Sequence, residues 1–241
     1  MKPRLDRWMV DFGLAESREK AQAQIMAGEV LINGQKATKA GQTVPEGSRV
    51  EVTVKMRYVG RGALKLEAAL AHFAVSVDGF VCADFGSSTG GFTDCLLQAG
   101  AAKVHCIDVG TNQLDWKLRN DPRVVVHENV NARYVELAEL GEPVDLAVCD
   151  VSFISATMIL PAMVRVLKPQ TGTIIVLVKP QFEVGRGQVG KGGIVRDPLQ
   201  HEAACEKLRA CASELGFMTE IMESPITGAE GNKEFLLYGR R

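Results

Sequence analysis

The spacing of hydrophobic positions changes near residue 63 and divides the chain into two parts. Apolar residues recur at helical spacing over 5–12 and 17–28, and each run ends at or beside a glycine, which favours helix termination. An apolar run at 30–32 is followed by Asn-Gly, a signal for a tight turn after a strand, and residues 49–54 alternate polar with apolar. These patterns predict a small α+β domain over residues 1–56.

From residue 63 onward, short apolar runs alternate with helical patterns. The runs that predict strands are 80–85, 103–109, 123–127, 144–150, 173–179, 217–222 and 234–239. The clearest helix lies over 197–216, where Asp197 is a good N-cap and Pro198 suits the first turn. Apolar strands separated by helices form mostly parallel sheets with helices on both faces. We therefore predict an α/β fold with a seven-stranded, mostly parallel sheet over 63–241, preceded by a basic, glycine-containing linker at 57–62.

The composition is that of an ordinary globular protein, with 46% hydrophobic and 24% charged residues among 241. The most apolar stretch, 173–178, is far too short to cross a bilayer, and the N-terminus carries no visible secretion signal. Six cysteines without a C-x-x-C pair predict reduced thiols, and four scattered histidines have no metal-binding spacing. We therefore expect a cytoplasmic protein that needs no metal and does not enter a membrane.

Charge is distributed unevenly, although the net charge is only −1. Residues 1–65 hold 12 Lys or Arg against 7 Asp or Glu, whereas the rest of the chain holds 16 against 22. A basic N-terminal part on an acidic body suggests that the N-terminal domain contacts a polyanion, although a solvated surface would have the same balance.

The sharpest local motif is DFGSSTGGF at 84–92, directly after the first predicted strand of the larger domain. Glycines in such a turn let the backbone approach a ligand at a helix N-terminus. Ser88 stands where the dinucleotide pattern needs glycine, and the P-loop ending G-K-[ST] is absent. Asp108, at the end of the next strand, has the usual position of a carboxylate that binds ribose hydroxyls. An adenosine cofactor without a pyrophosphate fits best, and we expect S-adenosylmethionine; a turn that merely packs tightly is the alternative.

Four charged residues lie where such a sheet presents its ligand side. Asp150 and Lys179 end two strands, Glu234 opens the last strand, and Lys65 lies on the helix before the sheet. Ligands of open α/β sheets bind outside the carboxyl ends of the strands. Taken singly, a strand-end lysine is more often a surface residue. The residues that we expect to contact the cofactor are Asp84, Gly86, Ser87, Thr89, Gly90, Phe92, Asp108, Asn129 and Asp150.

Six segments carry a more specific resemblance: RGALKL at 61–66, DFGSSTGGF at 84–92, DVG with QLDW over 108–116, DVSFIS at 150–155, VKPQFE at 178–183 and GKGGIVRD at 190–197. Together they resemble the hemolysin-A (TlyA-type) rRNA methyltransferases, relatives of the FtsJ/RrmJ ribose 2′-O-methyltransferases. Residues 3–54 resemble the small RNA-binding domain (alpha-L motif) shared with a small-subunit ribosomal protein and several pseudouridine synthases. The chain departs from the family's usual Y-V-S-R-G-G at Gly60 and Ala63, and from D-F-G-A-S-T-G-G at Ser87. None of these departures removes a functional group.

The resemblance implies a Rossmann-like class I methyltransferase domain over 63–241 that uses S-adenosylmethionine. It matches Lys65, Asp150, Lys179 and Glu234 to the Lys-Asp-Lys-Glu tetrad of ribose methyltransferases. Lys179, crowded by Lys65 and partly desolvated, would have a lowered pKa and act as the base. Asp150 and Glu234 would hold the lysines and the substrate in line.

The resemblance also implies a cytidine 2′-hydroxyl of ribosomal RNA as the methyl acceptor, with a preference for the large subunit. Expected partners are ribosomal RNA or ribosomal subunits, with no obligate protein partner. Phosphate contacts are expected from Arg4, Arg18, Lys20 and Lys39 in the N-terminal domain. Phe153 would stack on the target base or its neighbour, and a core position for this aromatic residue is the equal alternative.

Two other functions are alternatives: a catalytically inactive factor that binds rRNA or assists ribosome assembly, and a pore-forming hemolysin. The intact tetrad argues against the first, and the absence of an amphipathic membrane segment argues against the second. Other methyl acceptors also fit less well. The segment 150–153 reads DVSF where amino-group methylases carry [DN]-P-P-[YF], and Cys149 follows a valine rather than the proline typical of carbon-5 methylases.

Overall fold

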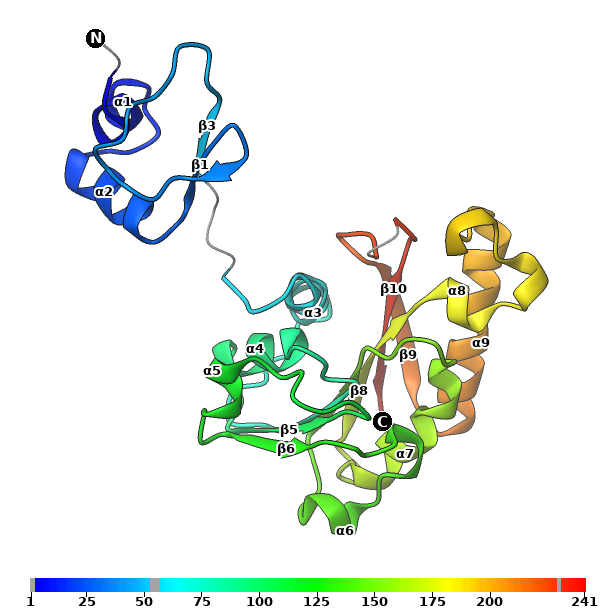
Figure 1. Ribbon diagram of the computed structural model, residues 1–241. Helices are drawn as coiled ribbons and strands as arrows, with labels where there is room; N and C mark the ends of the chain where they lie inside the picture. The colour runs from blue at the N-terminus through cyan, green and yellow to red at the C-terminus, as the bar shows by residue number, and fades with distance from the viewer. Residues whose placement is uncertain (1–2, 53–56, 229–230) are drawn as a thin grey trace. The chain divides into compact units, whose positions relative to one another are not determined.

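The computed structural model describes residues 3–52, 57–228 and 231–241, and the chain divides into two compact units, Met1–Arg57 and Tyr58–Arg241 (Figure 1). We call them the small unit and the large unit and describe each by itself. The expected strand residues 53 and 54, like the adjoining residues 55 and 56, lie outside the described residues.

Residues 58–61, which the sequence assigned to a linker, belong to the large unit. Tyr58 is buried and packs with Ala63 and Leu66, and its hydroxyl donates to Glu67 Oε1 at 2.8 Å. The backbone amide of Val59 donates to the buried carboxylate of Asp94 at 2.9 Å. These contacts tie the start of the large unit to its first helices.

The small unit combines two helices with a three-stranded antiparallel sheet. Its elements are α1 (Leu5–Asp11), α2 (Arg18–Met26), β1 (Val30–Ile32), β2 (Gln35–Lys36) and β3 (Val50–Val52), in sheet order β2-β1-β3. Ser17 caps α2 as predicted, because its Oγ accepts a hydrogen bond from Lys20 N at 3.2 Å. Leu5, Met9 and Ile25 are buried together in one core. The predicted α+β arrangement is confirmed.

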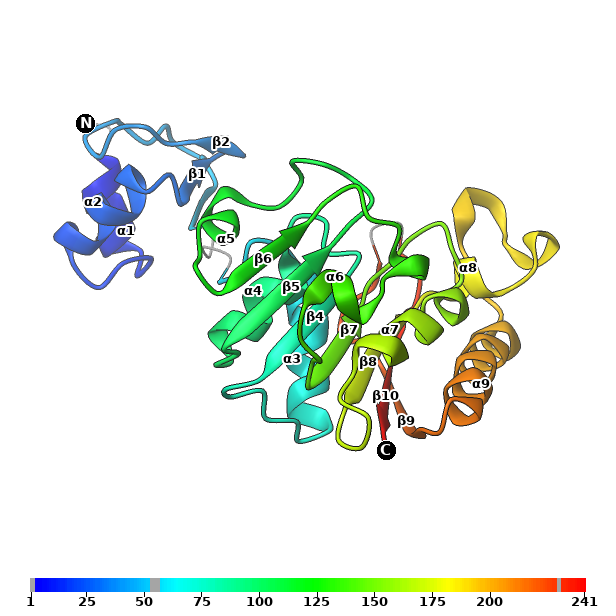
Figure 2. The same ribbon diagram turned by 90° about the horizontal axis from the view of Figure 1, so that it is seen from below.

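A seven-stranded sheet with the order β6-β5-β4-β7-β8-β10-β9 forms the centre of the large unit (Figures 1 and 2). Its strands are β4 (Val81–Phe85), β5 (Lys103–Ile107), β6 (Val124–His127), β7 (Leu146–Cys149), β8 (Thr173–Val178), β9 (Met218–Glu223) and β10 (Phe235–Arg240). The pairs from β6 through β8 are parallel, whereas β10 is antiparallel to both of its neighbours. Each predicted apolar run overlaps one of these strands, with β9 and β10 each ending one residue beyond the run, so the mostly parallel sheet is confirmed.

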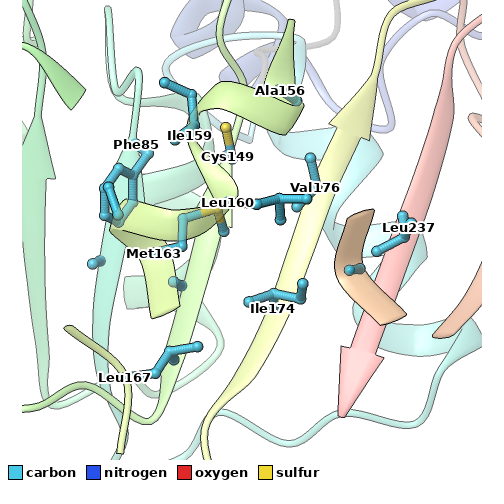
Figure 3. Packing of buried hydrophobic residues seen from close by; sticks show 14 of the residues in the cluster. Phe85, Cys149, Ala156, Ile159, Leu160, Met163, Leu167, Ile174, Val176 and Leu237 are labelled. Atoms are coloured by element: carbon cyan, nitrogen blue, oxygen red, sulfur yellow. The ribbon is translucent and has the colours of Figure 1, made fainter. Parts of the chain in front are cut away.

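Helices cover both faces of this sheet. They are α3 (Gly62–His72), α4 (Gly91–Gln98), α5 (Trp116–Arg119), α6 (Leu137–Leu140), α7 (Leu160–Val166), α8 (Pro180–Glu183) and α9 (Pro198–Glu214). One buried cluster joins α3 and α4 to the sheet, and a second joins α7 and α9 to the opposite face. Figure 3 shows part of the second cluster, where Leu160 and Met163 of α7 pack beside Ile174 and Val176 of β8. Asp197 caps α9 as predicted, since its Oδ1 accepts from Leu199 N at 3.0 Å.

The strand order changes direction at the centre of the sheet. From β4 the chain builds β5 and β6 toward one edge, and it then returns to place β7 on the other side of β4. The loops that follow β4 and β7 begin with Gly86 and Asp150 and leave the same end of the sheet. A crevice at such a switch point is the usual ligand site of an open α/β sheet.

The turn from β4 to α4 depends on Gly90, whose backbone is left-handed with φ +95°. A Cβ at this position would overlap Leu118 Cδ1 and would lie 2.7 Å from Leu114 Cδ1. Both leucines are buried, so neither has open space into which it could move. Gly90 therefore sets the close packing of this turn against the 114–118 segment.

We expect Gly90→Ala to lower the free energy of unfolding by about 2–4 kcal/mol, from backbone strain together with overpacking. Gly141→Ala is the matched control, because Gly141 also has a positive φ (+80°) but no atom within 4 Å of the added methyl group. Its cost should be about 1 kcal/mol, from the backbone alone. Urea unfolding measures both losses, and equal losses would contradict the packing role of Gly90.

Candidate functional site

Three adjoining cavities open at the carboxyl ends of β4, β5, β7 and β8. The β5 cavity (about 550 Å³) includes Asp108, Gln113 and Asn131 in its wall. The glycine-turn cavity (about 230 Å³) includes Gly60, Ser87 and Phe92, and the lysine cavity (about 440 Å³) includes Lys65, Gln181 and Glu234. Ser152 lines all three. Their combined size suits two ligands that meet near Ser152.

Gly86 brings the loops after β4 and β7 into contact. Its φ is +83°, and a Cβ there would lie 2.9 Å from the backbone oxygen of Asp150 and 3.0 Å from Val151 Cγ1. Only glycine avoids both the left-handed strain and these contacts. Gly86 and Asp150 therefore form a shared wall between the β5 and glycine-turn cavities.

Asp84 is a fully buried carboxyl group at the base of the glycine-turn cavity. Its Oδ2 accepts hydrogen bonds from Thr93 N at 3.0 Å and Thr93 Oγ1 at 2.7 Å, while Oδ1 has no partner among the described residues. Burial raises the pKa of Asp84 to about 7, and the nearby Asp150 carboxylate adds to the rise. A cationic hydrogen-bond donor in the cavity would stabilise the ionised carboxylate.

Asp108 follows β5, at the strand end where the sequence predicted it. Its Oδ2 accepts from Ser88 N at 2.8 Å and its Oδ1 accepts from Gly110 N at 2.7 Å. These two amides fix the plane of the carboxylate at the wall of the β5 cavity. Each oxygen still has a free lone pair, so the group can accept further hydrogen bonds from ligand hydroxyls.

The other residues predicted to contact a cofactor fall into two groups. Ser87, Thr89 and Phe92 line the glycine-turn cavity. Gly90 and Asn129 line none of the three cavities: Gly90 shapes the turn, and Asn129 is exposed in a left-handed conformation. The left-handed backbone at 129 turns the chain so that residues 131–133 form the cavity wall instead.

The four predicted tetrad residues come from four separate elements and form two ion pairs. Lys65 of α3 pairs with Glu234, which precedes β10, and both side chains are at most 10% exposed. Lys179 Nζ lies 2.6 Å from Asp150 Oδ1 and donates to Ser152 Oγ at 2.8 Å. Instead of facing each other unpaired, the lysines are each held by a carboxylate. Lone charges at such low exposure would be costly, and pairing offsets that cost.

A second set of polar contacts braces the loops on either side of Lys179. Glu183, at the end of α8, is buried; it accepts from Ser155 Oγ and from Ala156 N at 2.7 Å, and it pairs with Lys207 at 3.0 Å. The 150–155 loop is thus tied to the 179–183 segment at both ends. Sequence reasoning singled out neither Glu183 nor Lys207.

Phe153 lies in the middle of this braced loop and is 92% exposed. Its φ is +67°, a strained conformation for a bulky residue, and its ring centroid lies 5.4 Å from that of Phe182. Both rings line the lysine cavity. The alternative of a core position for Phe153 is therefore wrong, and the ring is free to meet a ligand.

Gln181 is a further polar residue in the wall of the lysine cavity that the sequence did not single out. Its Oε1 is buried and has no hydrogen-bond partner within the described part of the chain. Buried acceptors are nearly always satisfied in folded proteins, so an unpaired one beside a cavity suggests a donor on the ligand.

The basic residues predicted to bind RNA lie at the surface of the small unit. Arg4 and Arg18 both contact the buried carboxylate of Asp6, Lys20 pairs with Glu16, and Lys39 is exposed. No helix within residues 3–52, 57–228 and 231–241 is long and apolar enough to span a membrane. Across the same residues, no three His, Cys, Asp or Glu side chains come together to hold a metal ion.

The cysteines are free thiols, as the sequence predicted, and five of the six are buried. Cys149, which directly precedes Asp150, is among the buried ones, and burial raises the pKa of its thiol. An inert thiol at this position supports the exclusion of a cysteine nucleophile.

Comparison with known proteins gives matches for both units. Residues 58–241 match the FtsJ-like methyltransferase family, and residues 3–50 match the S4 domain. The "Putative rRNA methyltransferase YqxC" of Bacillus subtilis is 49% identical over 98% of this chain and 85% of its own length. The "16S/23S rRNA (cytidine-2'-O)-methyltransferase TlyA" of Mycobacterium tuberculosis is 46% identical over 99% of this chain and 90% of its own length. Among solved structures, "Putative hemolysin from Streptococcus thermophilus" has a TM-score of 0.76 and 45% identity, covering 100% of this chain and 88% of the other.

Proposed function

The chain belongs to the FtsJ-like methyltransferase family, and from this premise we propose that it transfers a methyl group from S-adenosylmethionine to a cytidine 2′-hydroxyl in ribosomal RNA. The observation that carries the proposal is the pairing of Lys179 with Asp150 and of Lys65 with Glu234, with both lysines in the wall of the lysine cavity. The relative from Mycobacterium tuberculosis, named as a cytidine-2′-O-methyltransferase, supports the same acceptor. A ribosomal substrate also supports a cytoplasmic location for the enzyme.

The polar groups that line the β5 and glycine-turn cavities suit S-adenosylmethionine. Asp108 would accept hydrogen bonds from the ribose hydroxyls, and the unpaired Asp84 Oδ1 would attract the cationic end of the molecule. Gly86 lines both cavities and allows the close approach of the loops after β4 and β7 that forms their shared wall. When bound, the cofactor supplies an electrophilic methyl group on a sulfonium sulfur.

The lysine cavity is where we place the target ribose. The ion pair with Asp150 and the bond to Ser152 fix Lys179 Nζ, so that it can hold the 2′-hydroxyl in line with the methyl group. Formation of the new O–C bond would break the methyl–sulfur bond and release the hydroxyl proton from the 2′-oxygen. We assign this proton to the Lys179–Asp150 pair as one unit, since the two groups form a close ion pair. Lys65 and Glu234 hold the opposite wall.

We expect Lys179→Ala to slow methyl transfer by at least about 10²-fold, the usual effect of losing a general base, with folding and cofactor binding nearly unchanged. Lys179→Arg should not restore the rate, because a guanidinium stays protonated and has a different donor geometry. Single-turnover transfer of a tritiated methyl group to ribosomal subunits measures the rate.

The matched control is Lys168→Ala, which breaks a lysine–carboxylate pair with Asp145 outside the three cavities. This variant should methylate at nearly the wild-type rate. A folded Lys179→Ala enzyme that is as active as Lys168→Ala would leave the proposed function without its main support.

Cofactor affinity should depend on pH through Asp84. As pH falls below about 7 the carboxyl takes up a proton, and the neutral form attracts a cationic ligand less than the carboxylate does. We therefore expect wild-type affinity to rise with pH and level off above pH 7, with a slope approaching about tenfold per unit on the acidic side. Asp84→Asn should bind more weakly with little pH dependence. Calorimetry between pH 5.5 and 8 measures the cofactor affinity of both proteins. The same pH dependence of affinity in the two proteins would show that Asp84 is not its source.

The unpaired oxygen of Gln181 supports the proposal that a base with an exocyclic amine binds in the lysine cavity. The cytosine amine can donate to the unpaired Oε1 while the ring stacks beside Phe153 and Phe182. An amide contact to a base edge typically contributes about 1–3 kcal/mol of discrimination.

We expect Gln181→Leu to reduce methylation of the target cytidine by about tenfold and to narrow the preference for cytidine over uridine at that position. Gln188→Leu is the control, because Gln188 is exposed and lines none of the three cavities. Methyl transfer to ribosomal subunits that carry either base at the target position gives the ratio. An unchanged ratio in Gln181→Leu would remove this residue from base recognition.

A further inference from the structure

Asp6 is a fully buried carboxylate in the first turn of α1, at the centre of a cluster of basic side chains. It accepts hydrogen bonds from Arg4 Nε at 3.1 Å and Nη2 at 3.0 Å, and from Arg18 Nε at 2.9 Å. Gln22 Nε2 at 2.9 Å and the backbone amide of Arg7 at 3.0 Å complete its shell. The carboxylate thus joins the start of α1 to the first two turns of α2.

The two arginines that Asp6 holds remain half exposed, with 51% of the Arg4 side chain and 55% of the Arg18 side chain accessible. The Arg4 guanidinium also lies flat against Gly41, where a Cβ would be 3.3–3.4 Å from three of its atoms. Arg4 uses one edge of its guanidinium on Asp6, and Arg18 uses only Nε. The remaining N–H groups of both side chains make no hydrogen bond within the described residues, so they can donate to a ligand.

We propose that Asp6 is a positioning residue that holds Arg4 and Arg18 as a preformed binding site for RNA phosphate. The inference rests on the proposed function, because it takes ribosomal RNA as the ligand of the small unit. A free arginine side chain loses up to about 2 kcal/mol of conformational entropy when it is ordered. Asp6 orders both side chains when the small unit folds, so less entropy is lost when RNA binds.

Net charge alone predicts that Asp6 weakens RNA binding, which is the opposite of the effect that we propose. A carboxylate near a polyanion is repelled, so Asp6→Asn, which raises the net charge by one, should tighten RNA binding on simple electrostatic grounds. Hydrogen bonds from Arg4 first, and from Gln22 and Arg18, hold the pKa of Asp6 well below its usual range, so the group is ionised throughout the neutral range. The sign of the change in affinity therefore separates positioning from net charge.

The experiment compares the full-length wild-type protein with Asp6→Asn for binding to deproteinised ribosomal RNA over a range of salt concentrations. We expect Asp6→Asn to bind about tenfold more weakly. Its plot of log affinity against log salt should be less steep by about 1–2, because each phosphate contact accounts for about 0.7–0.9 of the slope. We assign S-adenosylmethionine binding to the large unit, so its affinity in Asp6→Asn should stay at the wild-type value. This result would show that the large unit of the variant is folded.

Glu16→Gln is the matched control. Glu16 is an exposed acid on the same unit whose only role in the described contacts is a pair with Lys20, so its neutralisation should leave RNA affinity unchanged or raise it. Arg4→Lys and Arg18→Lys keep the charge but lose the directed guanidinium bonds, and each should also weaken RNA binding. These two variants test the proposal if Asp6→Asn does not fold.

Wild-type protein that does not bind ribosomal RNA would overturn the proposed function. If the wild type binds and Asp6→Asn binds as well or more tightly, the positioning role alone is overturned. If Asp6→Asn does not fold, the positioning role is overturned when Arg4→Lys and Arg18→Lys both keep the wild-type RNA affinity and the wild-type salt slope.

Discussion

The ion pair between Lys179 and Asp150 joins the ends of β8 and β7, and the rest of the candidate site is arranged around it. Each residue directly follows its strand, and parallel strands bring both to the same edge of the sheet. Because Lys179 is almost covered, neither charge can be left unpaired without a large cost in stability. The pair therefore fixes Lys179 beside Ser152, the residue that lines all three cavities.

The proposed reaction depends on charged side chains that their neighbours hold in place. Lys65 and Glu234 form a second buried pair, and Glu183 braces the loop that carries Phe153 in a strained conformation. In the proposed reaction such bracing would hold a weakly acidic hydroxyl and a methyl donor in line, which is where much of the acceleration of a group transfer arises. The small unit repeats the principle at its surface, where a buried carboxylate orders two exposed arginines.

The fold could be predicted from the sequence because strands buried on both faces are apolar throughout, and the same rule placed Asp108, Asp150 and Lys179 at strand ends. Side-chain partners could not be predicted in this way. Asn131 lines the β5 cavity where Asn129 was expected, and this difference depends on the left-handed backbone of Asn129. That Gln181 Oε1 is buried beside the lysine cavity without a partner among the described residues is known only from the folded structure. The sequence also does not show that Asp6 is buried and accepts hydrogen bonds from Arg4 and Arg18, because this depends on how α1 packs against α2.

The central claim is that this enzyme methylates the ribose 2′-oxygen of a cytidine in ribosomal RNA. Mass-spectrometric mapping of ribose methylation in rRNA tests it most directly, with cells that carry the gene compared with cells from which it has been removed. The account predicts at least one 2′-O-methylcytidine that disappears with the gene and returns when the gene is restored. Identical maps, or a lost methyl group that lies on a base instead of a ribose, would contradict it.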